Sequence, residues 1–226
     1  MPRETKSALR ERALEIAARL DREYPGATCA LHWKTPWQLL AATILSAQCT
    51  DDKVNEITPV LFQRYKTVRD LATATPEEVE QIIRPTGFYH NKTKSLIGAA
   101  QAILSGFGGE VPQTMADLLT LPGVARKTAN VVLGTAFGVA EGVVVDTHVS
   151  RLALRMALTP QPKTKSLNIE KIESDLMTLI PQDQWIKFGH CMTWHGRRVC
   201  TAKKAWCERC VVEELCPKMG VGKTPA

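Results

Sequence analysis

Apolar residues recur at helical spacing along most of this chain, and that pattern restricts the fold more than any other feature. Residues 9–20 follow the spacing before a Pro-Gly break at 25–26. Similar runs predict helices over residues 51–64, 91–105, 114–120, 126–137, 147–158, 168–179 and 184–197. Only the three valines at 143–145 resemble a strand, and they are too few to make a sheet. The predicted fold class is all-α.

Two sequence stretches predict where helices begin. TPWQ at 35–38 and TPEE at 75–78 each place a threonine cap before a proline at the first helical position. The third helical position then holds a residue that can complete a capping box, and for the second helix this residue is Glu78.

Length and composition fit a globular protein. The 226 residues allow one large domain or two modest ones, and 44% are hydrophobic. There is no run of about 18 apolar residues, so no membrane span is expected. The N-terminus leads into a helical pattern without an apolar signal core. An intracellular protein is expected, in the cytoplasm or nucleoid if the source is bacterial.

Positive charge gathers towards the C-terminus. The formal charge is +6, and the segment from Gln184 to Ala226 holds eight Lys or Arg against three Glu. Localised basicity is typical of a surface that faces phosphates, although a merely soluble tail has the same composition.

Four cysteines near the C-terminus have the spacing of metal ligands. They are separated by six, two and five residues: Cys200, Cys207, Cys210 and Cys216. Inside a cell, metal is a better interpretation than disulfides. Zinc sites usually pair two short Cys-Cys spacings, whereas only one is short here. The asymmetric spacing, with Pro217 after the last cysteine, favours a [4Fe–4S] cluster.

The segment between the first two of these cysteines is basic. Lys203 and Lys204 lie in it, so a metal there would stiffen a positively charged loop. A structural and DNA-positioning role is favoured over electron transfer. Cys29, Cys49 and Cys191 have no such spacing and are expected to be ordinary buried thiols.

The stretch LPGVARKTA, residues 121–129, predicts a helix, a tight turn and a second helix. Gly123 supplies the backbone freedom of the turn. The turn would direct the N–H groups at the start of the second helix outwards, where they can hold a phosphate. Gly123, Ala125 and Arg126 are therefore candidate contacts to the DNA backbone.

Lys127 follows in the first turn of that second helix. It could be a solvated residue, although a cation there is unfavourable for the helix dipole by about 0.3–1 kcal/mol. Alternatively it binds a phosphate, or it is a nucleophile, and a nucleophile acting on a sugar needs a carboxylate partner. Asp146, in VVVDTH, is the candidate. Asp146 could equally cap the following helix, and the two roles are compatible.

Three motifs follow one another along the chain: LPGVARKTA, then VVVDTH, then the four spaced cysteines. In this order and spacing they resemble the endonuclease III family, the iron–sulfur members of the helix-hairpin-helix DNA glycosylases. The similarity runs from about Thr35 to Cys216. The resemblance implies two all-α domains with DNA bound in the cleft between them. Residues 30–135 would form a helical barrel with the hairpin, and residues 1–29 plus 136–226 a second domain with the cluster. A monomer is expected.

The resemblance also implies the chemistry. The chain would be a base excision repair DNA glycosylase and abasic-site lyase acting on double-stranded DNA that contains damaged pyrimidines or abasic sites. Lys127 would attack the anomeric carbon and form a Schiff base, with Asp146 assisting by proton transfer or electrostatically. β-Elimination would then cut the strand.

Two further residues match positions that fill the space left by an extruded base. Gln48 lies in Ser-Ala-Gln and Phe88 in GFYHNK. A solvated helix end for Gln48 and a core position for Phe88 are the alternatives. His148 is expected to be structural rather than catalytic.

The sequence departs from the family at two positions. Ala125 replaces the second hairpin glycine, and a left-handed backbone there would be strained by about 1 kcal/mol. Leu119 replaces an acidic residue of many bacterial relatives, which would make the pocket for the damaged base less polar.

Two other functions would use parts of the same sequence pattern. Monofunctional relatives that remove a mispaired base share the cluster and the aspartate but generally lack the lysine. A non-catalytic DNA-binding module would need neither Lys127 nor Asp146, and the presence of both disfavours it.

Overall fold

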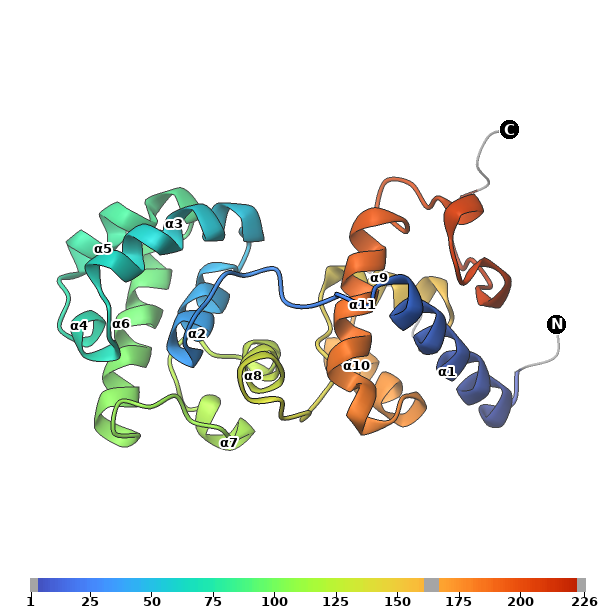
Figure 1. Ribbon diagram of the computed structural model, residues 1–226, viewed down its shortest axis with the longest axis horizontal. Coiled ribbons are helices and arrows are strands. Elements are labelled where there is room, and N and C mark those ends of the chain that lie inside the picture. Colours follow the sequence, from blue (N-terminus) through green and yellow to red (C-terminus); the bar gives the residue numbers. More distant parts are fainter. Residues whose placement is uncertain (1–3, 161–166, 223–226) are drawn as a thin grey trace. The chain divides into compact units, whose positions relative to one another are not determined.

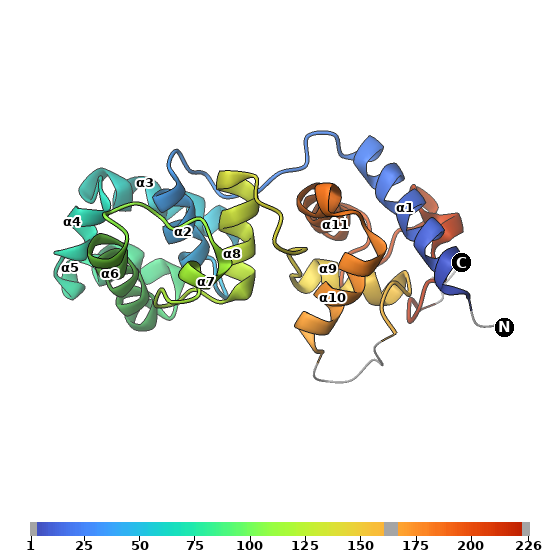
Figure 2. The ribbon, with the colours of Figure 1, turned by 90° about the horizontal axis from the view of Figure 1, so that it is seen from below.

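The computed structural model describes residues 4–160 and 167–222. Figure 1 and Figure 2 show helices joined by loops, and in the described part of the chain the only β-pairing is an isolated bridge between Cys200 and Ala205. The all-α fold class is thus confirmed. Among the described residues, none of the helices has the length and apolar composition that crossing a membrane requires.

The chain folds as two compact units. Unit 1 comprises residues 1–28 and 142–226, and unit 2 comprises Cys29–Glu141. The second boundary therefore falls at 141 rather than at the 135 expected from sequence. Phe137 and Val139 pack on the core of unit 2, and the Val139 N–H donates to Leu133 O at 3.0 Å, which keeps this segment with the helix before it.

Unit 2 holds seven α-helices around one core of buried aliphatic side chains. They are α2 (Pro36–Leu45), α3 (Asp51–Arg64), α4 (Val68–Ala72), α5 (Pro76–Ile83), α6 (Tyr89–Gly106), α7 (Met115–Leu118) and α8 (Arg126–Val132). A 3-10 turn, η1 (Arg84–Thr86), precedes α6, and a π-helical turn, η2 (Leu133–Phe137), extends α8. Of the α-helices, the sequence pattern missed only α4.

Unit 1 joins the two ends of the chain. Its α-helices are α1 (Lys6–Glu23), α9 (Thr147–Arg155), α10 (Ile169–Leu179) and α11 (Trp185–Arg198), followed by the short turns η4 (Cys207–Arg209) and η5 (Glu213–Leu215). In Figure 1 the blue α1 lies with the orange α11 because apolar residues of both helices share one core. The valines at 143–145 form no strand, and two of them are buried in this core.

The two predicted helix starts have different outcomes. Thr35 caps α2 as expected, since its side chain accepts the Gln38 N–H. Thr75 precedes α5 but makes no side-chain cap, so the predicted capping box is wrong. Glu78 instead accepts from the Tyr65 hydroxyl at 3.1 Å and from Arg64 at 3.2 Å. These partners, Arg64 at the end of α3 and Tyr65 just after it, link the Glu78 carboxylate to a neighbouring helix.

Candidate functional site

The stretch at 121–129 forms the predicted helix-turn-helix between α7 and α8. The turn is closed by the Val124 N–H, which donates to Leu121 O at 3.1 Å. Gly123 has φ +77°, in the left-handed region where a side chain is strained. A β-carbon at Gly123 would also lie 2.5 Å from Ser95 Cβ on α6. Only glycine fits this turn, for conformational and for steric reasons.

A second close contact fixes the hairpin to α6. A β-carbon at Gly98, one helical turn after Ser95, would lie 3.2 Å from the Pro122 ring. The turn therefore rests against α6 at two successive residues, Pro122 and Gly123, and its outer surface is held in one orientation.

Ala125 forms the N-cap of α8 in an extended conformation, φ −99° and ψ 169°. The left-handed strain considered for this alanine is therefore absent, because an extended backbone suits any residue. Its methyl group accepts no hydrogen bond, so α8 has no side-chain cap. Arg126, partly exposed, and Lys127, exposed, follow in the first turn.

Lys127 is the second residue of α8. Its side chain is exposed, and within the described residues it makes no hydrogen bond or ion pair. A structural lysine usually covers apolar surface or pairs with a carboxylate. This amine is available to a ligand instead.

Asp146 is the N-cap of α9, as the cap interpretation expects. Its Oδ1 accepts the N–H groups of His148 and Val149, each at 2.8 Å. Among the described residues, its Oδ2 has a single long hydrogen bond, 3.4 Å from the Thr193 hydroxyl of α11. One oxygen is thus fixed by the helix and the other is still able to accept a proton or hydrogen bond.

His148 has structural contacts. Its Nδ1 lies 3.1 Å from Arg151 Nη2, and its Cβ lies where a side chain on Gly196 would be, 2.7 Å away. The absence of a side chain at Gly196 lets α9 approach α11 closely. This environment agrees with the structural histidine predicted.

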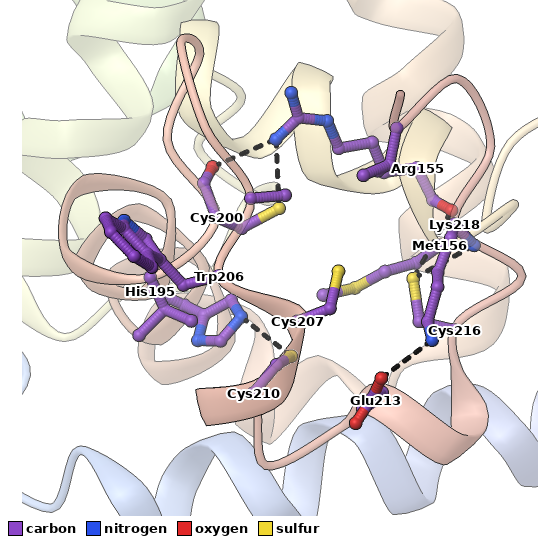
Figure 3. Close-up of a pocket in the computed structure, with 13 residues that line it drawn as sticks. Arg155, Met156, His195, Cys200, Trp206, Cys207, Cys210, Glu213, Cys216 and Lys218 are labelled. Carbon is purple, nitrogen blue, oxygen red and sulfur yellow. Dashed lines mark hydrogen bonds and ion pairs between the residues drawn. The ribbon is translucent and has the colours of Figure 1, made fainter. Parts of the chain in front are cut away.

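The four C-terminal cysteines line one recess in unit 1 (Figure 3). Cys200 comes shortly after α11, Cys207 begins η4, Cys210 follows η4 and Cys216 follows η5. No three His, Cys, Asp or Glu side chains of the described residues are placed to hold a single metal ion. The four sulfurs instead surround a shared space.

Hydrogen-bond donors surround these sulfurs. Arg155 Nη1 donates to Cys200 Sγ at 3.1 Å, and the Lys218 N–H donates to Cys216 Sγ at 3.3 Å. The ring of His195, which is fully buried, places Nε2 3.3 Å from Cys210 Sγ (Figure 3). Sequence reasoning missed Arg155 and His195, although the two arginines of α9, one helical turn apart, were a visible signal.

Burial shifts the titration of these thiols. It raises the pKa of Cys210 to about 11, and it raises the pKa of Cys207 and of Cys216. Without a positive centre, such thiols would keep their protons at neutral pH. A bound metal centre would reverse this, because its charge stabilises the thiolates. Four thiols around one recess, with donors directed at the sulfurs, fit a cysteine-ligated cluster.

The basic residues between Cys200 and Cys207 are exposed and ordered. The Thr201 hydroxyl donates to Lys204 O at 2.7 Å and accepts the Lys204 N–H at 3.0 Å. The Lys204 amine lies 3.4 Å from the centroid of the Trp206 ring. Lys203 extends beside it into solvent.

The two residues predicted to enter DNA share an unusual backbone. Gln48 follows α2 with φ +53°, and Phe88 precedes α6 with φ +49°. Gln48 is exposed, and Phe88 is 63% exposed, so the core alternative for Phe88 is wrong. The predicted residues thus fall into two sets. Unit 2 carries Gln48, Phe88 and the hairpin with Lys127, and unit 1 carries Asp146, the four cysteines and the two lysines beside them.

A hairpin with an available lysine, a helix-capping aspartate and a four-cysteine recess define the class of helix-hairpin-helix DNA-repair proteins. The family model of the HhH-GPD superfamily base excision DNA repair proteins matches residues 41–182. The chain is 54% identical to endonuclease III of Synechocystis sp. over 92% of this chain and 93% of the relative. It is 38% identical to endonuclease III of Escherichia coli over 90% and 93%.

Solved structures agree. A trapped endonuclease III–DNA covalent intermediate superposes with a TM-score of 0.86 at 36% identity, covering 92% of this chain and 96% of that one. A thermostable thymine-DNA glycosylase, at 22% identity and a TM-score of 0.81, shares the fold. The chain belongs to the HhH-GPD superfamily of base excision DNA repair proteins and, within it, to the endonuclease III family. It is a bifunctional DNA glycosylase and abasic-site lyase.

Proposed function

We propose that this chain removes oxidised pyrimidines from double-stranded DNA and cleaves the abasic strand through a Schiff base on Lys127. The observation that carries the assignment is the exposed Lys127 side chain, without a partner in the described residues, directly behind the hairpin. The covalent endonuclease III–DNA intermediate among the similar structures is consistent with a nucleophile on the protein.

The proposed reaction begins with the neutral amine of Lys127. Its nitrogen bonds to C1′ as the bond from C1′ to the base breaks, and the base leaves with a proton. Opening of the sugar ring, with loss of the amine proton, gives the Schiff base. Removal of a proton from C2′ then expels the 3′ phosphate, which cuts the strand.

Asp146 has the complementary role in this proposal. Oδ2, the oxygen not used by the helix cap, would stabilise the positive charge that develops on the sugar or transfer a proton. Because the cap already fixes the carboxylate, no ordering of this side chain is required during the reaction.

Cys200, Cys207, Cys210 and Cys216 would hold a [4Fe–4S] cluster. When bound, the cluster supplies a cross-link between four points of a loop-rich segment. The protein residues would do the rest: Arg155 donates to Cys200 Sγ, His195 lies against Cys210 Sγ, and the segment between Cys200 and Cys207 would present Lys203 and Lys204 to DNA phosphates.

The remaining contacts follow from the same proposal. Backbone groups at Gly123 and Ala125, with the Arg126 side chain, would hold the DNA backbone. Gln48 and Phe88 would enter the duplex where the damaged nucleotide leaves it. The chain would act as a monomer on DNA inside the cell, with unit 2, Cys29–Glu141, as the barrel domain. Leu119, which is 46% exposed, would make lesion recognition less polar.

Borohydride trapping tests the lyase assignment. Reduction of the Schiff base converts it to a stable amine, so the wild-type protein should become cross-linked to DNA containing thymine glycol. Lys127→Ala should lose trapping while its affinity for undamaged duplex changes by less than about threefold, since one of several phosphate contacts is removed.

Arg126→Ala is the matched control, because it removes the neighbouring cation of the same helical turn. At saturating DNA it should still be trapped. Base release by the wild-type protein without any trapping would contradict the lyase assignment, and would favour the monofunctional alternative.

A further inference from the structure

Phe88 combines an unfavourable backbone conformation with an unfavourably exposed side chain. A left-handed backbone is a genuine outlier for a bulky residue, and a 63% exposed phenylalanine gains little from burial. Gly87, just before it, has φ +70° and ψ 161°, a conformation that glycine alone adopts readily. Contacts made by other residues must therefore stabilise the Gly87–Phe88 turn.

Lys92 provides those contacts on both sides of the turn. Its amine donates to Thr86 O at 2.8 Å, before Gly87, and its backbone N–H donates to Phe88 O at 3.1 Å, after Gly87. Thr86 is itself fixed, since it is 2% exposed and its hydroxyl donates to Ile83 O at 2.8 Å. One residue thus ties the start of α6 to the end of η1.

The cost of this arrangement argues for a positional role. Lys92 is only 5% exposed, and a buried ammonium loses its hydration. It also lies in the first helical turns of α6, where the helix dipole disfavours a cation. Its hydrogen bond to Thr86 O has to offset these costs.

Burial lowers the pKa of the Lys92 amine, as expected when an ammonium group loses its hydration.

We propose that Lys92 is a positioning residue, whose buried amine holds the Thr86 carbonyl and thereby keeps Phe88 presented to solvent before DNA arrives. The inference rests on the proposed function, in which Phe88 enters the duplex. The turn would then be preorganised, so that the Phe88 side chain needs no ordering when DNA binds.

Fluorine NMR tests the positioning directly, without DNA. The chain contains five phenylalanines, and the Phe88 resonance of fluorophenylalanine-labelled protein is assigned with Phe88→Leu. Lys92→Met keeps the apolar stem and removes the donor, so the Phe88 resonance should narrow and move towards that of the free amino acid. The other four should not change.

Lys94→Met is the matched control, because Lys94 is an exposed lysine of the same helix. It should leave all five resonances in place. If Lys92→Met does not fold, Lys92→Gln replaces it, since its shorter side chain cannot reach the Thr86 oxygen. A Phe88 resonance identical to wild type in the folded variant would overturn the proposal.

Single-turnover base release tests the functional consequence. Lys92→Met should slow excision by about tenfold, the effect of a misplaced contact, with unchanged affinity for undamaged duplex. If Lys92 acts through Phe88, Lys92→Met combined with Phe88→Ala should be no slower than Phe88→Ala alone. Additive losses would overturn the proposal.

The role of Phe88 in excision and the role of Lys92 in holding the turn are tested independently. If Phe88→Ala leaves excision and DNA affinity unchanged, the wedge assignment of the proposed function is wrong. The fluorine spectra would still decide whether Lys92 holds the turn.

Discussion

The carboxylate of Asp146 caps α9 through Oδ1, while Oδ2 accepts a long hydrogen bond from Thr193. The helix cap and the proposed catalytic group are therefore two oxygens of one side chain. The two roles can be separated by substitution, because asparagine caps a helix about as well as aspartate but carries no charge.

We expect Asp146→Asn to slow single-turnover base release by about 10²- to 10⁴-fold, the usual contribution of a general acid or base. The melting temperature and the affinity for undamaged DNA should stay close to wild type. Asp146→Ala should lose the same activity and, in addition, about 1 kcal/mol of stability from the lost cap. Near-normal excision by Asp146→Asn would show that Asp146 acts only as a helix cap.

The hairpin shows how one element depends on close packing with its neighbour. Gly123 is left-handed and its missing β-carbon leaves room for Ser95, whereas Gly138 is left-handed with nothing within 4 Å of such an atom. Alanine substitutions at the two glycines therefore distinguish the free-energy cost of backbone strain from that of a steric clash.

Gly138→Ala should cost about 1–2 kcal/mol of unfolding free energy, from backbone strain alone. Gly123→Ala should cost more, because Ser95 or the turn must move, and should also weaken binding to undamaged duplex. Urea unfolding and fluorescence anisotropy measure the two effects. Equal costs for both variants would show that the Ser95 contact relaxes freely.

The uncapped start of α8 gives a further prediction. Ala125→Ser would supply the missing acceptor and should stabilise the protein by about 1 kcal/mol. The same hydroxyl would compete with a phosphate for the N–H groups of the first turn, so affinity for undamaged duplex should fall. A gain in both stability and affinity would contradict phosphate binding by the N–H groups at the start of α8.

At the scale of the whole molecule, the four-cysteine segment is part of the core of unit 1. Val212, between the third and fourth cysteines, is fully buried. Arg12 of α1 donates to Leu215 O at 3.1 Å and to Met156 O at 2.7 Å, linking the segment to α1 and to the end of α9. Loss of the proposed cluster should therefore loosen unit 1 first.

Chelation of iron should increase amide hydrogen exchange over residues 199–222 and in α1, since both depend on the same contacts. Helices α2 to α6 of unit 2 should keep their protection and act as the internal control. Iron content and visible absorbance should fall together with the exchange protection. Stoichiometric zinc in the purified protein would refute the [4Fe–4S] assignment.

Local sequence patterns predicted most helices because periodicity and caps act within a few residues. The runs at 51–64 and 184–197 coincide closely with α3 and α11. Glu78 failed as a capping-box residue because Arg64 and Tyr65 compete for its carboxylate, and a sequence window around α5 does not contain them. Phe88 was placed correctly at an exposed loop, but its left-handed backbone has no local signature.

The sequence by itself determined the all-α class, the order of the hairpin, aspartate and cysteine motifs, and the family. Those features depend on residue type and spacing along the chain. Only the tertiary structure decided that Ala125 is extended and unstrained, that one Asp146 oxygen is committed to a cap, and that Lys92 is buried under the Phe88 turn. Backbone conformation, partner choice and burial at these residues depend on neighbours brought together by folding, which no short stretch of sequence contains.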